Sequence, residues 1–228
     1  MKKSPLLTSL RAAKGDWQRF QTHYPALRRA YEQHLNQPLR AEVQAMARQD
    51  QQLAFTHLLK LSKRAKERFL REKFAPHSAR QIAKLTRMLR EQGYPGEQLI
   101  GNGSWMARIL SHHNSISVAH TQADTLYQQL QPALLSALQR GELAPAEYAT
   151  FDDWYVASKS DGREEAYGYL KPLTEQELPL ANARRARIGL RSVDLRNQLV
   201  TIQEQTGLNL LLDGTFWVKG RILVVPKR

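Results

Sequence analysis

Two neighbouring histidines are the residues of this sequence best suited to acid–base chemistry, because imidazole gains and loses a proton near neutral pH. They are His112 and His113. A histidine that acts as a general acid or base needs a carboxylate to orient its ring, and Asp153 or Asp152 could supply it. His113 paired with one of these carboxylates is therefore a candidate catalytic centre.

Two further residues would complete such a centre. Tyr167 offers a hydroxyl donor, and the guanidinium of Arg185 could hold an anion. The other interpretation is structural: both aspartates lie in solvent, Tyr167 packs in a hairpin, and Arg185 lies on a solvated helix face. Both interpretations stay open at the level of sequence.

Three residues of the same region could together form a metal site. On an unbroken helix, His113, His120 and Asp124 would share a face and offer nitrogen and oxygen ligands for zinc or a similar ion. However, Asn114 and Ser115 tend to interrupt a helix, and the spacing is not that of the HExxH zinc motif. We therefore expect structural histidines, with no metal ion and no cofactor.

Other reaction classes are disfavoured by what the chain lacks. It contains no cysteine, which excludes disulfides, thiolate zinc sites and a cysteine nucleophile. The sequence has no P-loop, dinucleotide fingerprint, GxSxG elbow or kinase motif set. The apolar run near Leu6 is too short for a signal peptide, and no segment approaches the roughly 20 apolar residues of a membrane span. We expect a cytoplasmic protein with no membrane partner.

The positive charge is concentrated in the first part of the chain. The formal net charge is +13, and residues 1–100 hold 20 Lys/Arg against 8 Asp/Glu, whereas residues 101–228 hold 14 against 13. A dense basic cluster lies at one predicted helix end: Lys63, Arg64, Lys66, Arg68, Arg71 and Lys73. Such a cluster is typical of a surface for nucleic acid or an acidic protein. More often, such a run is a solvated face whose cations complement the dipole at a helix C-terminus.

The apolar spacing predicts a mainly α fold, a multi-helix domain with a small β-hairpin and a C-terminal antiparallel β-meander. Apolar residues at intervals of three and four predict a long helix from Leu39 to about Phe74, preceded by two short helices separated at Pro25. Ser78 is expected to cap the next helix. Further helices are expected near 104–114, 118–140, 145–155, 178–187 and 192–206.

Turn residues suggest where the strands lie. Asp161-Gly162 is typical of a hairpin turn, and the residues from Leu208 to Val225 alternate strands with Asp-Gly and Lys-Gly turns. The chain is expected to divide into an N-terminal helical extension (1–38), a helical core domain (39–191), and a C-terminal helix with a meander packed on the core (192–228).

Several short segments together resemble an uncharacterised bacterial domain-of-unknown-function family. The segments, over about residues 39–191, are Leu39-Arg40-Ala41-Glu42 to Asp50, Tyr94-Pro95, Leu99-Ile100-Gly101, His112-His113, Tyr148 to Asp153, Tyr167-Gly168 and Arg185 to Leu190. The resemblance implies that the family's polar set falls on His113, Asp153, Tyr167, Gly168, Arg185, Gly189 and Leu190. The chain departs from the family pattern at four positions. His112 replaces Gln, Trp154 replaces Arg, and Tyr169-Leu170 replaces Thr-Gln.

Two functions follow as expectations. The favoured one is a non-enzymatic binding module that uses its basic helical surface for nucleic acid or an acidic protein partner. The alternative is a hydrolase or transferase with His113 as acid/base, Asp153 as its orienting carboxylate, and Tyr167 or Arg185 stabilising charge. The departures at Trp154 and Leu170 favour the binding module.

Overall fold

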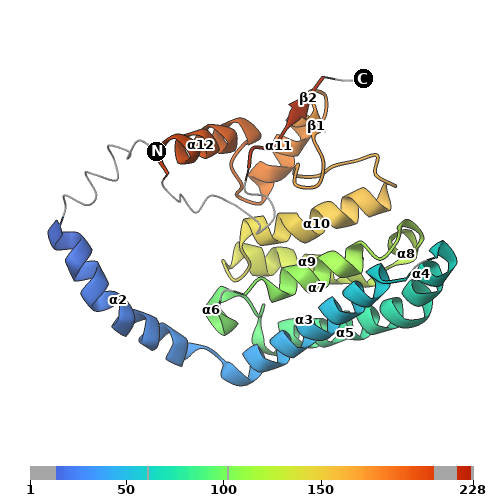
Figure 1. Ribbon diagram of the computed structural model, residues 1–228, viewed down its shortest axis with the longest axis horizontal. Coiled ribbons are helices and arrows are strands. Elements are labelled where there is room, and N and C mark those ends of the chain that lie inside the picture. The colour runs from blue at the N-terminus through green and yellow to red at the C-terminus, as the bar shows by residue number, and fades with distance from the viewer. Residues whose placement is uncertain (1–13, 61, 102, 208–219, 227–228) are drawn as a thin grey trace.

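The structure is a computed structural model that describes residues 14–60, 62–101, 103–207 and 220–226. The described chain is mainly helical, which confirms that part of the predicted fold class. Its helices are α2 (Lys14–His34), α3 (Gln37–Leu58), α4 (Lys63–Phe69), the π-helical turn η1 (Leu70–Phe74), α5 (Ala75–Gln92), α6 (Glu97–Ile100), α7 (Trp105–Asn114), α8 (Val118–Ala123), α9 (Leu126–Gln139), α10 (Pro145–Lys159), α11 (Leu178–Arg187) and α12 (Val193–Thr206) (Figure 1).

The strands differ from the predicted meander. Two of its strands would lie between Leu208 and Val218, outside the described residues. Of the third, only β2 (Val224–Val225) is a strand, and it pairs in parallel with β1 (Leu173–Thr174). The predicted antiparallel pairing is therefore wrong. An apolar alternation predicts that a segment is extended, but the choice of partner strand depends on which edge lies nearby in the fold.

The predicted hairpin at Asp161-Gly162 is also wrong, because this dipeptide ends a helix. Both residues have positive φ angles, 53° for Asp161 and 74° for Gly162. The Gly162 N–H donates to the carbonyl of Ala157 at 2.7 Å, which closes the last turn of α10. Residues with positive φ suit a helix C-terminus as well as a hairpin turn, so the sequence pattern fits both structures.

Helix boundaries in the first hundred residues also differ from those predicted. Pro25 lies inside the single helix α2. The helix predicted to run from Leu39 to Phe74 ends at Leu58, and a new helix begins after Ser62, whose hydroxyl accepts from the N–H of Ala65 at 3.2 Å. This local cap outweighs the apolar periodicity that continues through the break.

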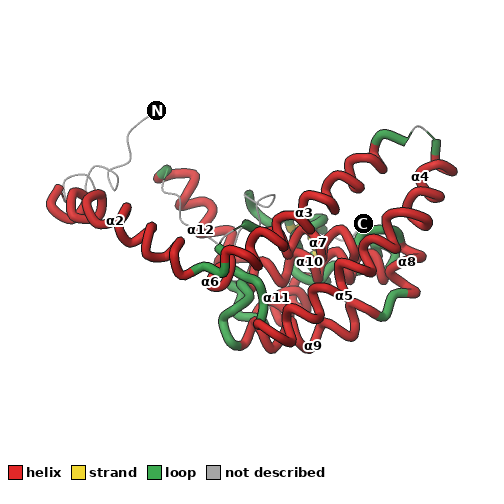
Figure 2. The backbone as a smooth tube through the Cα atoms, turned by 90° about the horizontal axis from the view of Figure 1, so that it is seen from below, coloured by secondary structure: helices red, strands yellow, loops and turns green. Residues whose placement is uncertain are grey.

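The long helix of the molecule is instead the continuous stretch α4–η1–α5, Lys63 to Gln92. The residues at its two internal junctions, Leu70 and Ala75, have ordinary α-helical backbone angles, so the chain does not leave the helical path there. Ser78 is therefore buried within this helix and does not cap its start. Seen from below, the end of α3 and the start of α4 stand clear of the helices behind them (Figure 2).

Helix α7 lies at the centre of the fold, packed against α3, α5 and α10. The core around it includes fully buried apolar side chains from each of these elements, among them Val43, Leu85, Leu110 and Phe151. This position places the two histidines at the end of α7 among three other helices.

The two ends of the described chain pack differently. Helix α2 extends away from the body with its described side chains exposed (Figure 1). In contrast, α12 is joined to the final segment, because Asn197 exchanges two hydrogen bonds of 2.8 Å with the backbone of Ile222. The predicted boundaries near residues 38 and 191 fall just inside α3 and just before α12, and the division into domains stays a prediction. None of the described helices combines the length and apolar composition needed to cross a membrane.

Candidate functional site

Asp153 holds a loop in place. Its carboxylate accepts hydrogen bonds from the N–H groups of Ala166 and Tyr167, at 3.0 and 2.7 Å, and of Tyr169 at 2.9 Å. The side chain is fully buried. Three hydrogen bonds from successive parts of one loop to a single side chain fix the path of that loop. Asp153 therefore has a clear structural role here.

A second carboxyl group lies beside Asp153. Burial and then the charge of Glu165 raise the pKa of Asp153 well above its ordinary value, and burial raises the pKa of Glu165. Glu165 accepts from the N–H of Leu170 at 3.0 Å, and a hydrogen bond with the side chain of Asp153 partly offsets the effect of burial on its pKa. Two carboxyl groups in such a site retain a proton above the pH at which either would lose it in water.

Asp152 faces a group of tyrosines. It accepts from the hydroxyls of Tyr127 at 2.7 Å and Tyr167 at 3.1 Å, and from the amide of Gln131 at 3.1 Å. Burial raises the pKa of Asp152, and also those of Tyr127 and Tyr167. The tyrosine hydroxyls are therefore hydrogen-bond donors at neutral pH, as the sequence analysis expected of Tyr167.

Arg185 joins α11 to the same loop. It is fully buried, and its guanidinium donates to the carbonyls of Arg191 at 2.6 Å and Tyr167 at 2.9 Å. It also lies over the ring of Tyr169, 5.5 Å from the centroid. The predicted solvated helix face is not observed for Arg185. Its described partners are backbone carbonyls and an aromatic ring, which is the environment of a structural cation.

The structure thus brings together four of the predicted residues, Asp152, Asp153, Tyr167 and Arg185, but His113 has other partners. In the described chain no hydrogen bond or ion pair joins His113 to Asp152 or Asp153. The Nδ1 atom of His113 lies 2.8 Å from the hydroxyl of Ser78 on α5, and its Nε2 atom lies 3.2 Å from a carboxylate oxygen of Asp124.

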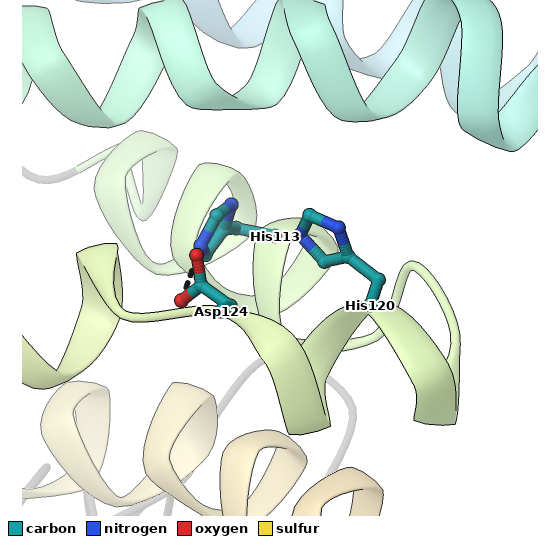
Figure 3. A group of neighbouring side chains, drawn as sticks. All are labelled: His113, His120 and Asp124. Carbon is teal, nitrogen blue, oxygen red and sulfur yellow. Dashed lines mark ion pairs between the residues drawn. The ribbon is translucent and has the colours of Figure 1, made fainter.

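Asp124 and His120 form a cluster with His113. Figure 3 shows the three side chains pointing toward one another, with His113 on α7 and the other two on α8 and its end. The rings of His113 and His120 are nearly perpendicular, with centroids 5.4 Å apart. One candidate ligand atom from each residue lies within 4.8 Å of the others. The break that the sequence predicts at Asn114 and Ser115 does occur, and the turn after it brings α8 back against His113.

The electrostatics of this cluster favour a charged aspartate and a neutral His120. Burial would raise the pKa of Asp124, but the contact with His113 and the hydrogen bonds from the N–H groups of Tyr127 and Leu126 outweigh it and lower the pKa to about 2. Burial lowers the pKa of His120, and the neighbouring His113 lowers it further. The Nε2 atom of His120 is buried with no hydrogen-bond partner among the described residues.

His112 forms a separate pair, which the sequence analysis did not identify. Its Nδ1 atom makes a very short contact with a carboxylate oxygen of Asp50, a fully buried residue of α3. His112 also faces a pocket of about 480 Å³, whose lining includes Gln51, Arg108, Ser111, Ser115, Trp154, Tyr169 and Leu170. The sequence signal for this pair is Asp50 itself, since a carboxylate close to the apolar face of a helix needs a buried partner.

Side chains from three elements meet at this pocket. His112, Trp154 and the pair Tyr169-Leu170 come from α7, α10 and the following loop, and all of them line it. The wall of the pocket therefore carries an imidazole, an indole, a phenol and an aliphatic side chain.

The predicted basic cluster lies on the long helix. Lys63, Arg64, Arg68, Arg71 and Lys73 are exposed and Lys66 is half-buried. Two exposed ion pairs occur within it, Lys63 with Glu67 at 4.0 Å and Arg71 with Glu72 at 3.0 Å. The helix carries four more exposed cations that the sequence analysis did not include: Arg80, Lys84, Arg87 and Arg90.

Comparisons with known proteins give no match: no family model matches the chain, nor does any curated protein or solved structure. The resemblance to a domain-of-unknown-function family therefore stays a prediction.

Proposed function

We propose that the protein is a binding module whose long helix, α4–η1–α5, binds nucleic acid through the basic cluster at its N-terminal end. Between Lys63 and Gln92 the chain has ten Lys/Arg and three Asp/Glu. At about 1.5 Å per residue the helix is about 45 Å long, so its cations could contact several successive phosphates.

The position of the cluster in the helix is the observation that carries this proposal. Six cations at the C-terminal end of a helix would have a structural explanation, because they would complement the helix dipole. Lys63 is instead the first residue after the Ser62 cap, and the helix continues to Gln92. Lys63, Arg64 and Lys66 lie in the first turn, where positive charge opposes the dipole and costs stability, which supports a functional reason for their presence.

Charge reversal tests this proposal. The variant with Arg64→Glu, Lys66→Glu, Arg68→Glu and Arg71→Glu should bind a labelled DNA duplex at least about tenfold more weakly than the wild type in fluorescence anisotropy. A matched control reverses four exposed cations elsewhere, Arg163, Arg187, Arg191 and Arg221. Equal affinity losses in both variants would mean that only net charge matters. If the wild type binds an acidic protein but does not bind DNA, the basic cluster is a surface for a protein partner.

A second candidate function is a hydrolase or transferase reaction in the His112 pocket. The buried carboxylate of Asp50 would orient the ring of His112 and fix its tautomer, which is the arrangement of a general acid or base. His112 then takes the role that the sequence analysis gave to His113.

This second candidate is tested with p-nitrophenyl esters and phosphates as generic substrates. We expect turnover by the wild type to fall at least about 100-fold in His112→Gln. Exposed His23 provides the control variant, His23→Gln. Turnover that survives in His112→Gln would exclude the pocket as the reaction site.

A further inference from the structure

We propose that His113, His120 and Asp124 bind one zinc ion. This inference reverses the expectation of no metal, and it is independent of nucleic-acid binding by the long helix. Two imidazoles and a carboxylate form a donor set that zinc commonly takes in proteins, and three protein ligands leave a fourth position for water.

The separations suit a zinc ion. With zinc–ligand bonds of about 2.0 Å and tetrahedral angles, two ligand atoms lie about 3.3 Å apart. His113 Nε2 and the Asp124 oxygen are already 3.2 Å apart. The three candidate ligand atoms lie within 4.8 Å of one another, so the ring of His120 must move closer to the other two for all three to bind one ion. It is half-buried on the short helix α8, where a small shift of the ring is feasible.

The hydrogen bonds around the cluster orient the ligand atoms. Ser78 can accept the Nδ1 proton of His113, which leaves a lone pair on Nε2 directed at the cluster. A hydrogen-bonded partner of this kind is usual for metal-ligating histidines. Asp124 is held in turn by the N–H groups of Leu126 at 3.2 Å and Tyr127 at 3.0 Å.

One buried nitrogen of the cluster has no partner without a metal. The Nε2 atom of His120 is buried with no hydrogen-bond partner among the described residues, whereas Nε2 of His113 lies 3.2 Å from the Asp124 carboxylate. An unsatisfied buried polar atom costs stability. A divalent cation bound by all three side chains would satisfy this nitrogen and would offset the charge of Asp124.

The test is zinc binding by the full chain after treatment with a chelator. Isothermal titration with Zn²⁺ alone should give one ion per chain. We expect affinity to fall at least about 100-fold in His120→Ala and Asp124→Asn, and about 10- to 100-fold in Ser78→Ala. His120→Ala removes a half-buried ring, and Asp124→Asn keeps an oxygen acceptor for one of the two N–H groups, which donate to different carboxylate oxygens. Circular dichroism checks that both variants fold.

Cobalt provides a second readout. Co²⁺ in this site should give the visible absorption of a four-coordinate ion, and His120→Ala should lose it. His23→Ala, which removes an exposed histidine on α2, should bind zinc and cobalt as the wild type does. Zinc binding that is unchanged in His120→Ala and Asp124→Asn would overturn the proposal, and so would the absence of stoichiometric binding by the wild type.

Discussion

Adjacent residues on α7 have different surroundings, because consecutive side chains of an α-helix point about 100° apart. His112 contacts Asp50 and the pocket, whereas His113 contacts Ser78 and Asp124. The sequence identifies the histidine pair as chemically capable. It does not identify Asp50 as a partner, because these residues are 62 positions apart and meet only when α3 packs against α7.

The pair formed by Asp153 and Glu165 gives a prediction at the same scale. Both pKa values are raised, so the folded chain holds more protons than the unfolded chain above about pH 4. The free energy of unfolding should therefore fall as pH rises from about 4 through the raised pKa values. In Glu165→Gln the amide can donate to Asp153, so this fall should be smaller and the variant about 1 kcal/mol more stable than the wild type at pH 8.

Urea unfolding at several pH values between 4 and 8 measures this difference. The matched control is Glu164→Gln, which removes the same charge from an exposed neighbour. The control should follow the pH dependence of the wild type. Parallel curves for the wild type and Glu165→Gln would show that the two carboxyl groups do not share a proton.

Among the elements, helices with clear local stop signals were predicted well. Helix α11 spans Leu178–Arg187 as expected, and Ser192 caps α12 through a bond to the N–H of Leu195. The prediction failed where one signal has two meanings. Asp161-Gly162 suits a helix end as well as a hairpin, and Ser78 resembles a cap in sequence but is a buried partner of His113.

The loop held by Asp153 gives a prediction at the element scale. Gly168 has a φ of +85°, and a Cβ atom there would lie 2.9 Å from side-chain carbons of both Ile222 and Leu173. Gly168→Ala should therefore destabilise the protein by about 2–4 kcal/mol, through the left-handed backbone and through crowding against β1 and the final segment.

A matched glycine separates these two costs. Gly162 also has a positive φ, +74°, but a Cβ atom there would meet nothing within 4 Å. Gly162→Ala should lower the free energy of unfolding by only about 1–2 kcal/mol, the cost of the left-handed backbone, in the same urea unfolding experiment. Equal losses in the two variants would mean that the packing of Gly168 against Ile222 and Leu173 contributes nothing.

Over the whole molecule, the charge asymmetry was evident from the sequence, but its arrangement was not. Residues 1–100 carry the excess charge, and the structure gathers ten of those cations on one helix, Lys63 to Gln92. Composition fixes the number of charges. Because α3 ends at Leu58, the basic cluster begins a helix instead of ending one. Its cations therefore cannot be explained as complementing the dipole at a helix C-terminus.

The salt dependence of DNA binding tests nucleic-acid binding by the long helix most directly. If phosphate contacts carry the affinity, the logarithm of the association constant should fall linearly with the logarithm of the salt concentration. Reversing Arg64, Lys66, Arg68 and Arg71 should then reduce the slope by about 3–4, since each phosphate contact contributes about 0.9. Parallel slopes for the wild type and this variant would contradict the account, because the basic cluster would then make no phosphate contacts.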